Sequence, residues 1–133
     1  MIQLADKLQA VGKVVSVAID NATHPNLDLE MLRAHPGIVI ITMSSYDSNM
    51  TIFENVVDGG VSSGVDYSAG VSASHISWGD QPPSRAAIED RVAYLESHNV
   101  SSVSIFGDWE ATTNDSATLL NVFAPVLQRF LHG

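Results

Sequence analysis

The sequence predicts an α/β domain, with α+β as the alternative class. Three apolar runs have the length and composition of buried strands, and they lie at 14–19, 38–43 and 101–106. Segments with helical spacing of apolar residues separate these runs. Hydrophobic residues make up 45% of the 133 residues and charged residues 16%, which is typical of a globular protein. We therefore expect one domain, 1–133, with three layers, a central mixed sheet, an N-terminal βαβ unit and a C-terminal helix.

The first third of the chain predicts the βαβ unit. Residues 2–11 suit a short amphipathic helix that ends at Gly12, and the strand at 14–19 follows. Asn26 is the expected cap of a second helix, which His35-Pro36-Gly37 should end because the residue before proline avoids helical geometry. The strand at 38–43 comes next. The connection is long enough for the two strands to pair in parallel.

The middle of the chain, 49–80, leaves two alternatives open. One is an antiparallel meander with strands near 51–57, 61–67 and 71–78, in which Asp58-Gly59-Gly60 forms a turn. The other is a long loop rich in serine and glycine, and such loops are uncommon unless they have a functional role. We favour the meander, which would make the sheet mixed.

The last third predicts a helix, a strand and a helix. Ser84 is the expected N-cap of a helix whose buried stripe holds Ile88, Val92 and Leu95. After the strand at 101–106, Asn114 or Asp115 should cap the terminal helix, which Pro125 should kink. The predicted core comprises Val15, Val17, Ile19, Ile38, Ile40, Ile88, Val92, Leu95, Val103, Ile105, Leu119, Phe123 and Phe130.

Acidic residues follow each of the three predicted strands. Asp20 follows the first, Asp47 the second, and Asp108 with Glu110 the third. The carboxyl ends of strands are where α/β folds collect ligands, so these four residues are the candidate catalytic groups. Oxygen ligands suit Mg²⁺ or Ca²⁺, and imidazoles extend the set, so the candidate metal ligands are Asp20, Asp108, His24 and His75. The alternative interpretation is structural, because Asp also caps helices and turns.

Composition and charge exclude several classes of function. The formal net charge is −9, and no lysine or arginine lies between Arg33 and Arg85, which argues against binding to nucleic acid or to an anionic membrane. The chain has no cysteine, so disulfides and thiolate chemistry are excluded. We see neither a leader nor an apolar run long enough for a membrane span, and we expect a cytoplasmic protein.

Two function classes remain. The first is an acidic interaction module that binds a protein partner or forms a homo-oligomer, without a cofactor. The second is a small hydrolase with an acidic site at the strand ends, with or without Mg²⁺ or Ca²⁺. The phosphate-binding and nucleophile-elbow motifs are absent, so the first class is preferred and the question of enzymatic activity stays open.

Overall fold

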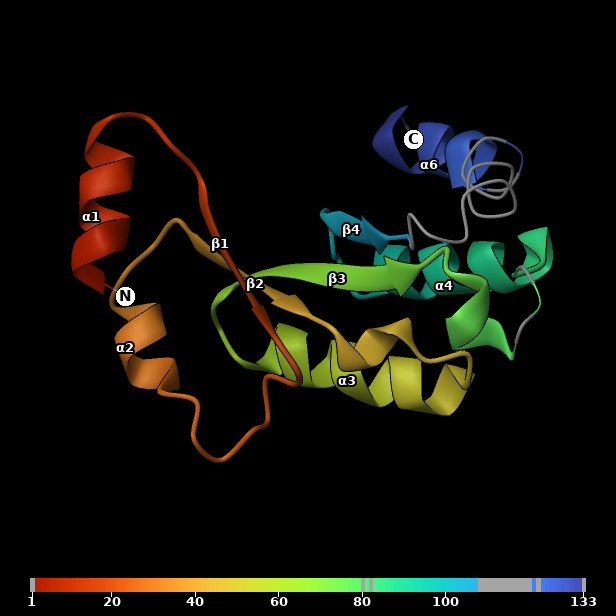
Figure 1. Ribbon diagram of the computed structural model, residues 1–133, viewed down its shortest axis with the longest axis horizontal. Coiled ribbons are helices and arrows are strands. Elements are labelled where there is room, and N and C mark those ends of the chain that lie inside the picture. The colour runs from red at the N-terminus through yellow and green to blue at the C-terminus, as the bar shows by residue number, and fades with distance from the viewer. Residues whose placement is uncertain (1, 80, 82, 108–120, 122, 133) are drawn as a thin grey trace.

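A four-stranded sheet forms the centre of the molecule (Figure 1). The strands are β1 (Val15–Ile19), β2 (Ile38–Thr42), β3 (Asp66–Ser72) and β4 (Val103–Phe106). They lie in the order β1-β2-β3-β4, and each neighbouring pair is parallel. This computed structural model describes residues 2–79, 81, 83–107, 121 and 123–132.

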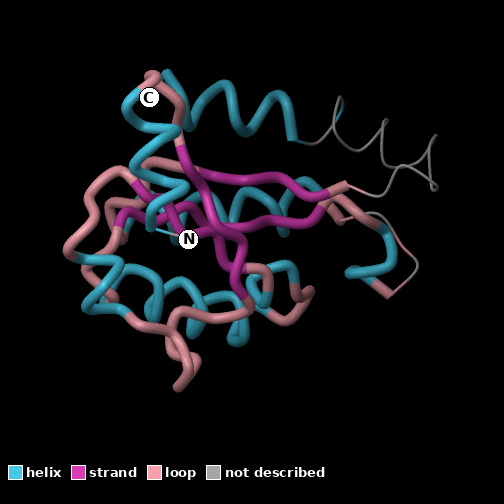
Figure 2. Tube along the Cα trace, turned by 60° about the vertical axis from the view of Figure 1, so that its left-hand side comes forward, coloured by secondary structure: helices cyan, strands magenta, loops and turns pink. Residues whose placement is uncertain are grey.

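Helices connect and flank the strands (Figure 2). The helix α1 (Ile2–Ala10) precedes β1, and α6 (Ala124–His132) follows β4. Between successive strands lie α2 (Leu29–Arg33), α3 (Met50–Ser62) and α4 (Arg85–Ser97). Two 3₁₀ turns, Ser44–Tyr46 and His75–Trp78, follow the carboxyl ends of β2 and β3.

Both hydrophobic clusters lie on one face of the sheet. The register places Val17, Ile40 and Tyr67 side by side on this face. The same alternation continues to Ala69 and Val71 in β3, and to their partners in β4. One cluster joins α1 and α2 to β1 and β2, and the other joins α3, α4 and α6 to β3 and β4. The described helices therefore pack against the same side of the sheet.

Side-chain caps define where three of these helices begin. Asp28 Oδ1 accepts from Met31 N at 2.9 Å, Asn49 Oδ1 from Thr51 N at 2.9 Å, and Ser84 Oγ from Ala87 N at 3.1 Å. Each bond satisfies a backbone donor that the first helical turn leaves unpaired. Ser84 is the predicted cap, whereas Asp28 takes the place predicted for Asn26.

The opposite face of the sheet, which we call the open face, has no α-helix against it in the described part of the chain, and the 3₁₀ turn Ser44–Tyr46 lies over β3. Alternation places ten residues on it, namely Ser16, Ala18, Val39, Ile41, Asp66, Ser68, Gly70, Ser72, Ser104 and Phe106. Ala18 is exposed, and Phe106 keeps 45% of its surface in solvent. Tyr46 covers part of this face and stacks on Phe106, with 5.2 Å between ring centroids.

The predicted α/β class, βαβ unit and C-terminal helix are confirmed. The predicted mixed sheet is wrong, because residues 50–62 form α3 and all four strands are parallel. Phe53, Val56, Val57 and Gly60 form the buried side of α3, and this helical spacing prevails over the turn predicted at Gly59-Gly60. Gly60 is required there, since a Cβ atom would lie 2.4 Å from the Tyr67 ring.

Most of the predicted core is confirmed. Ile38, Ile40, Ile88, Val92, Leu95 and Phe123 are at most 2% exposed. Val15, Val17, Ile19, Val103, Ile105 and Phe130 are partly buried against the two clusters. Leu119 and the two predicted caps at 114 and 115 lie outside the described residues.

Within the described ranges, the structure contains no helix with the length and hydropathy needed to cross a membrane.

Candidate functional site

The predicted site residue Asp20 meets Ser44 where β1 and β2 end. The Ser44 hydroxyl donates a hydrogen bond to Asp20 Oδ1. The backbone supports this contact, because Met43 N donates to Ile19 O at 2.8 Å and Ser44 N to Asp20 O at 3.0 Å. Adjacent parallel strands thus bring together a carboxylate and a hydroxyl that are far apart in sequence. Asp20 is exposed, so its charge is accessible to solvent and to ligands.

Asp47 lies near this pair but acts at the start of α3. Its Oδ1 accepts from Asn49 N at 2.7 Å, next to the Asn49 cap itself. Asp47 also lines a hollow of about 460 Å³ together with Met43, Ser44, Tyr46, Ile52 and Ser77. One carboxylate oxygen therefore has a structural partner, as the alternative interpretation predicts, while the side chain remains exposed.

The predicted metal ligands are only partly brought together. His24 and Asp20 line the same hollow of about 280 Å³, and His24 Nδ1 accepts from Asn26 N at 3.2 Å. Asp108 and Glu110 lie outside the described residues, and the His75 side chain is not described either. Among the side chains that are described, no three of His, Asp or Glu cluster closely enough to hold a metal ion.

The sequence analysis did not single out Arg91, a buried cation that fixes the loop at this edge. Its side chain is 3% exposed, and its guanidinium donates to Asp47 O at 3.2 Å and Ser48 O at 2.9 Å. The guanidinium also lies 4.3 Å from the centroid of the Trp78 ring. Burial lowers the pKa of Arg91, and the charges of Asp90 and Asp47 oppose that shift. The spacing of residues could have indicated its burial, because Arg91 lies on the same side of α4 as the buried Ile88 and Leu95.

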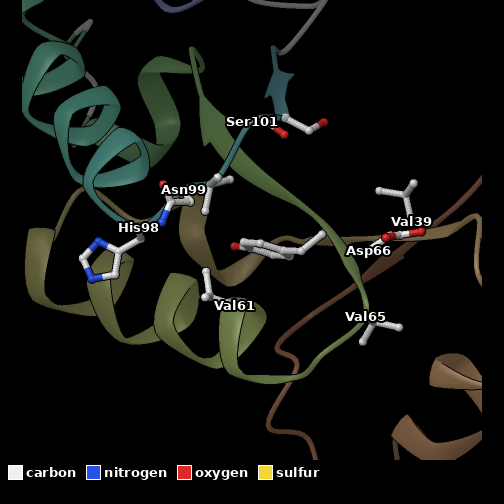
Figure 3. Close-up of a pocket in the computed structure, with 10 residues that line it drawn as sticks. Val39, Val61, Val65, Asp66, His98, Asn99 and Ser101 are labelled. Carbon is white, nitrogen blue, oxygen red and sulfur yellow. The ribbon is translucent and has the colours of Figure 1, made fainter.

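A third hollow, of about 390 Å³, lies at the amino ends of β3 and β4 (Figure 3). Val61 and Val65 supply apolar walls, and Asp66 and His98 lie at its margin. These polar groups have partners already: Asp66 Oδ2 accepts from Gly37 N at 3.0 Å, and His98 Nδ1 lies 2.9 Å from Tyr94 O. The hollow thus combines apolar surface with satisfied polar groups, and it presents no pair of groups suited to acid–base chemistry.

Serine hydroxyls satisfy one another on the open face. Ser68 Oγ lies 2.9 Å from Ser104 Oγ and receives a hydrogen bond from Ser102 Oγ at 3.0 Å. Ser68 is 2% exposed. Its hydroxyl would be costly to bury without these partners. The hydroxyls therefore make this surface compatible with burial in an interface.

No protein-family model matches the sequence, and neither a curated protein nor a solved structure shows a significant match to it. Function must therefore be inferred from the geometry of the chain itself.

That geometry offers two chemical possibilities. The Asp20–Ser44 pair is accessible and could bind a cation or orient a polar ligand. The open face offers small, mostly uncharged side chains over four strands, with charge depleted as in the centre of a protein interface.

Proposed function

We propose that this chain is a protein-association module that binds through its open face. The observation that carries the proposal is the one-sided packing of the sheet: both hydrophobic clusters lie on the opposite face. Sheets built from parallel strands are almost always covered on both faces, because their crossovers place helices or further strands there. The described chain leaves this face exposed around Ala18 and Phe106, and we expect a binding partner to cover it there.

The charge distribution supports this proposal. Asp66, at the amino end of β3, is the one charged side chain that alternation adds to the open face within the described strands. The protein as a whole carries 21 charged residues. Depletion of charge distinguishes the buried centre of protein interfaces from the remaining surface.

Site-specific photo-cross-linking tests the proposal. A benzophenone side chain replaces Ala18 on the open face in one variant and Ala86, which is exposed on α4, in the other. We expect protein adducts of defined mass from position 18 in cells that express the chain, and none from position 86. Equal labelling from the two positions, or no adduct from position 18, would refute the proposal.

A second candidate function is a metal-assisted hydrolase, which the contact between Asp20 and Ser44 favours. In this case Asp20 would bind Mg²⁺ or Ca²⁺ and polarise a polar substrate at the strand ends. Ion at about 100 times its Kd should stabilise the fold by about 2.7 kcal/mol. Melts of metal-stripped protein with each ion measure this effect. Asp20→Asn should abolish it, whereas Asp6→Asn, the same change at an exposed position in α1, should not.

A further inference from the structure

The sheet ends at two unpaired edges within the described chain. Among the residues that the structure describes, β1 pairs only with β2 and β4 only with β3, so none of them pairs with the outer sides of β1 and β4. Unpaired edges of this kind readily accept another strand. The two edge strands, β1 and β4, run in the same direction, because all four strands are parallel.

The topology indicates how such edges can be satisfied. Strands that follow one another in sequence order, with every crossover on the same face, curl into a closed barrel in which the helices form the outer layer. Eight strands close such a barrel with an interior just wide enough for side chains to fill. Four strands in sequence order, with their helices on one face, supply half of that arrangement.

We infer that a second copy of this chain closes the sheet, with β1 of each copy pairing in parallel with β4 of the other. A two-fold axis along the barrel generates both seams, so one self-complementary contact satisfies all four edges. The inference rests on the proposed function, since the open face of each copy becomes the interior of the barrel. The partner is a second copy of the chain, which supplies its own β1 and β4 edges.

The open-face side chains fit this interior. Ser16, Ala18, Ser68, Gly70 and Ser104 are small, and Val39 and Ile41 are the branched residues that commonly fill parallel barrels. The larger side chain, Phe106, lies at the carboxyl end of its strand, where the ring stacks on Tyr46 instead of filling the centre. The interior therefore combines small and branched residues, and the one charged side chain, Asp66, lies at its amino end, where it accepts a hydrogen bond from Gly37 N at 3.0 Å.

The approach to β1 carries unusual apolar exposure. Leu4 is 62% exposed, Val11 68% and Val14 84%, and all three precede or border the free edge of β1. In the closed barrel, α6 of the partner follows its β4 and therefore lies beside α1.

The seam can be tested with cysteines, because the natural chain has none. Within one copy β1 and β4 are about 14 Å apart, which is three strand spacings. A disulfide needs Cα atoms about 4–7 Å apart, so an intramolecular bond is excluded. Double variants combine Ser16→Cys or Ala18→Cys in β1 with Ser104→Cys or Phe106→Cys in β4, which covers the alternative registers on this face. We expect at least one to form a covalent dimer under mild oxidation, and no single variant to form a disulfide, because equivalent residues lie across the barrel.

Sedimentation equilibrium supplies the second measurement. We expect a dimer for the natural chain, a loss of affinity of at least about tenfold for Ala18→Glu, and no change for Ala86→Glu. A charge introduced into the barrel interior is costly, whereas Ala86 is exposed on a helix. A natural chain that is monomeric at about 100 μM, well above the Kd of even a micromolar complex, would overturn the inference. So would a dimer that tolerates Ala18→Glu, or one that forms none of the disulfides.

The two proposals can fail separately. In one outcome, position 18 cross-links only to another protein while sedimentation shows a monomer. That result would refute the dimer and support the association module. If position 18 gives no adduct and sedimentation shows a monomer, both proposals are refuted.

Discussion

Arg91 provides the most direct test of how the carboxyl edge of the sheet is held. The buried guanidinium donates three charge-assisted hydrogen bonds to backbone carbonyls, at 47, 48 and 87, and it lies 5.2 Å from the Phe53 ring centroid. Replacing Arg91 with methionine keeps an unbranched apolar stem and removes all three hydrogen bonds. Each such bond contributes about 1.5–3 kcal/mol, and the cost of burying the charge, which disappears with it, offsets part of that sum.

We therefore expect Arg91→Met to lower the free energy of unfolding by about 3 kcal/mol, which corresponds to a fall in Tm of roughly 10 °C. Urea denaturation followed by circular dichroism measures the first quantity, and calorimetry the second. Arg85→Met is the matched control on the same helix. Arg85 pairs with Glu89 at 3.0 Å, but both side chains are more than a third exposed, so the loss should be below about 1 kcal/mol. Equal effects of the two substitutions would refute the argument.

The remaining predictions concern α4, β3 and a surface tyrosine. Gly70→Ala should destabilise the fold by about 1–3 kcal/mol, measured by urea denaturation, because the added Cβ would lie 2.4 Å from the backbone oxygen of Thr42. Gly107→Ala is the control, because no described atom beyond its chain neighbours lies within 4 Å of the added Cβ, and it should cost less than about 0.5 kcal/mol. Partial desolvation and the Asp58 carboxylate, to which the hydroxyl donates at 2.6 Å, raise the pKa of Tyr94 from 10.0 to about 12. Because folding raises this pKa, the protonated Tyr94 hydroxyl stabilises the folded state below pH 10, and that stabilisation is lost as the pH rises toward 12. Ultraviolet titration should show that Asp58→Asn lowers the raised pKa of Tyr94. Ser84→Ala should cost about 1 kcal/mol in urea, since it removes an N-cap, and an unchanged denaturation midpoint would contradict that role.

The sequence predicted β1, β2 and β4 because the first two are nearly continuous apolar runs and the third holds Val103 and Ile105. It missed the bounds of β3 (Asp66–Ser72), because serine, glycine and aspartate interrupt the apolar pattern of that strand. The helix α3 was missed for a physical reason. Its β-branched residues and its two glycines oppose helix formation locally, and burial of Phe53 and Val57 against the sheet outweighs them.

The candidate site was predictable only where chain direction determines it. The contact between Asp20 and Ser44 follows from two parallel strands that end at the same edge. The role of Arg91 was not predictable, because it depends on Trp78 and a loop from another part of the chain meeting one side of α4. The open face likewise required the order of the strands, which no local pattern specifies.

The order of the strands also has a consequence for folding. Each strand pairs with the one that precedes it in the chain, so no pairing has to wait for a distant segment. As the chain leaves the ribosome, β2 can dock on β1, then β3 on β2 and β4 on β3, each with the helix that links it to the growing edge. Loops closed in this sequence are short, which favours rapid folding for a parallel sheet. The sheet can thus form stepwise, with one βα unit added at a time.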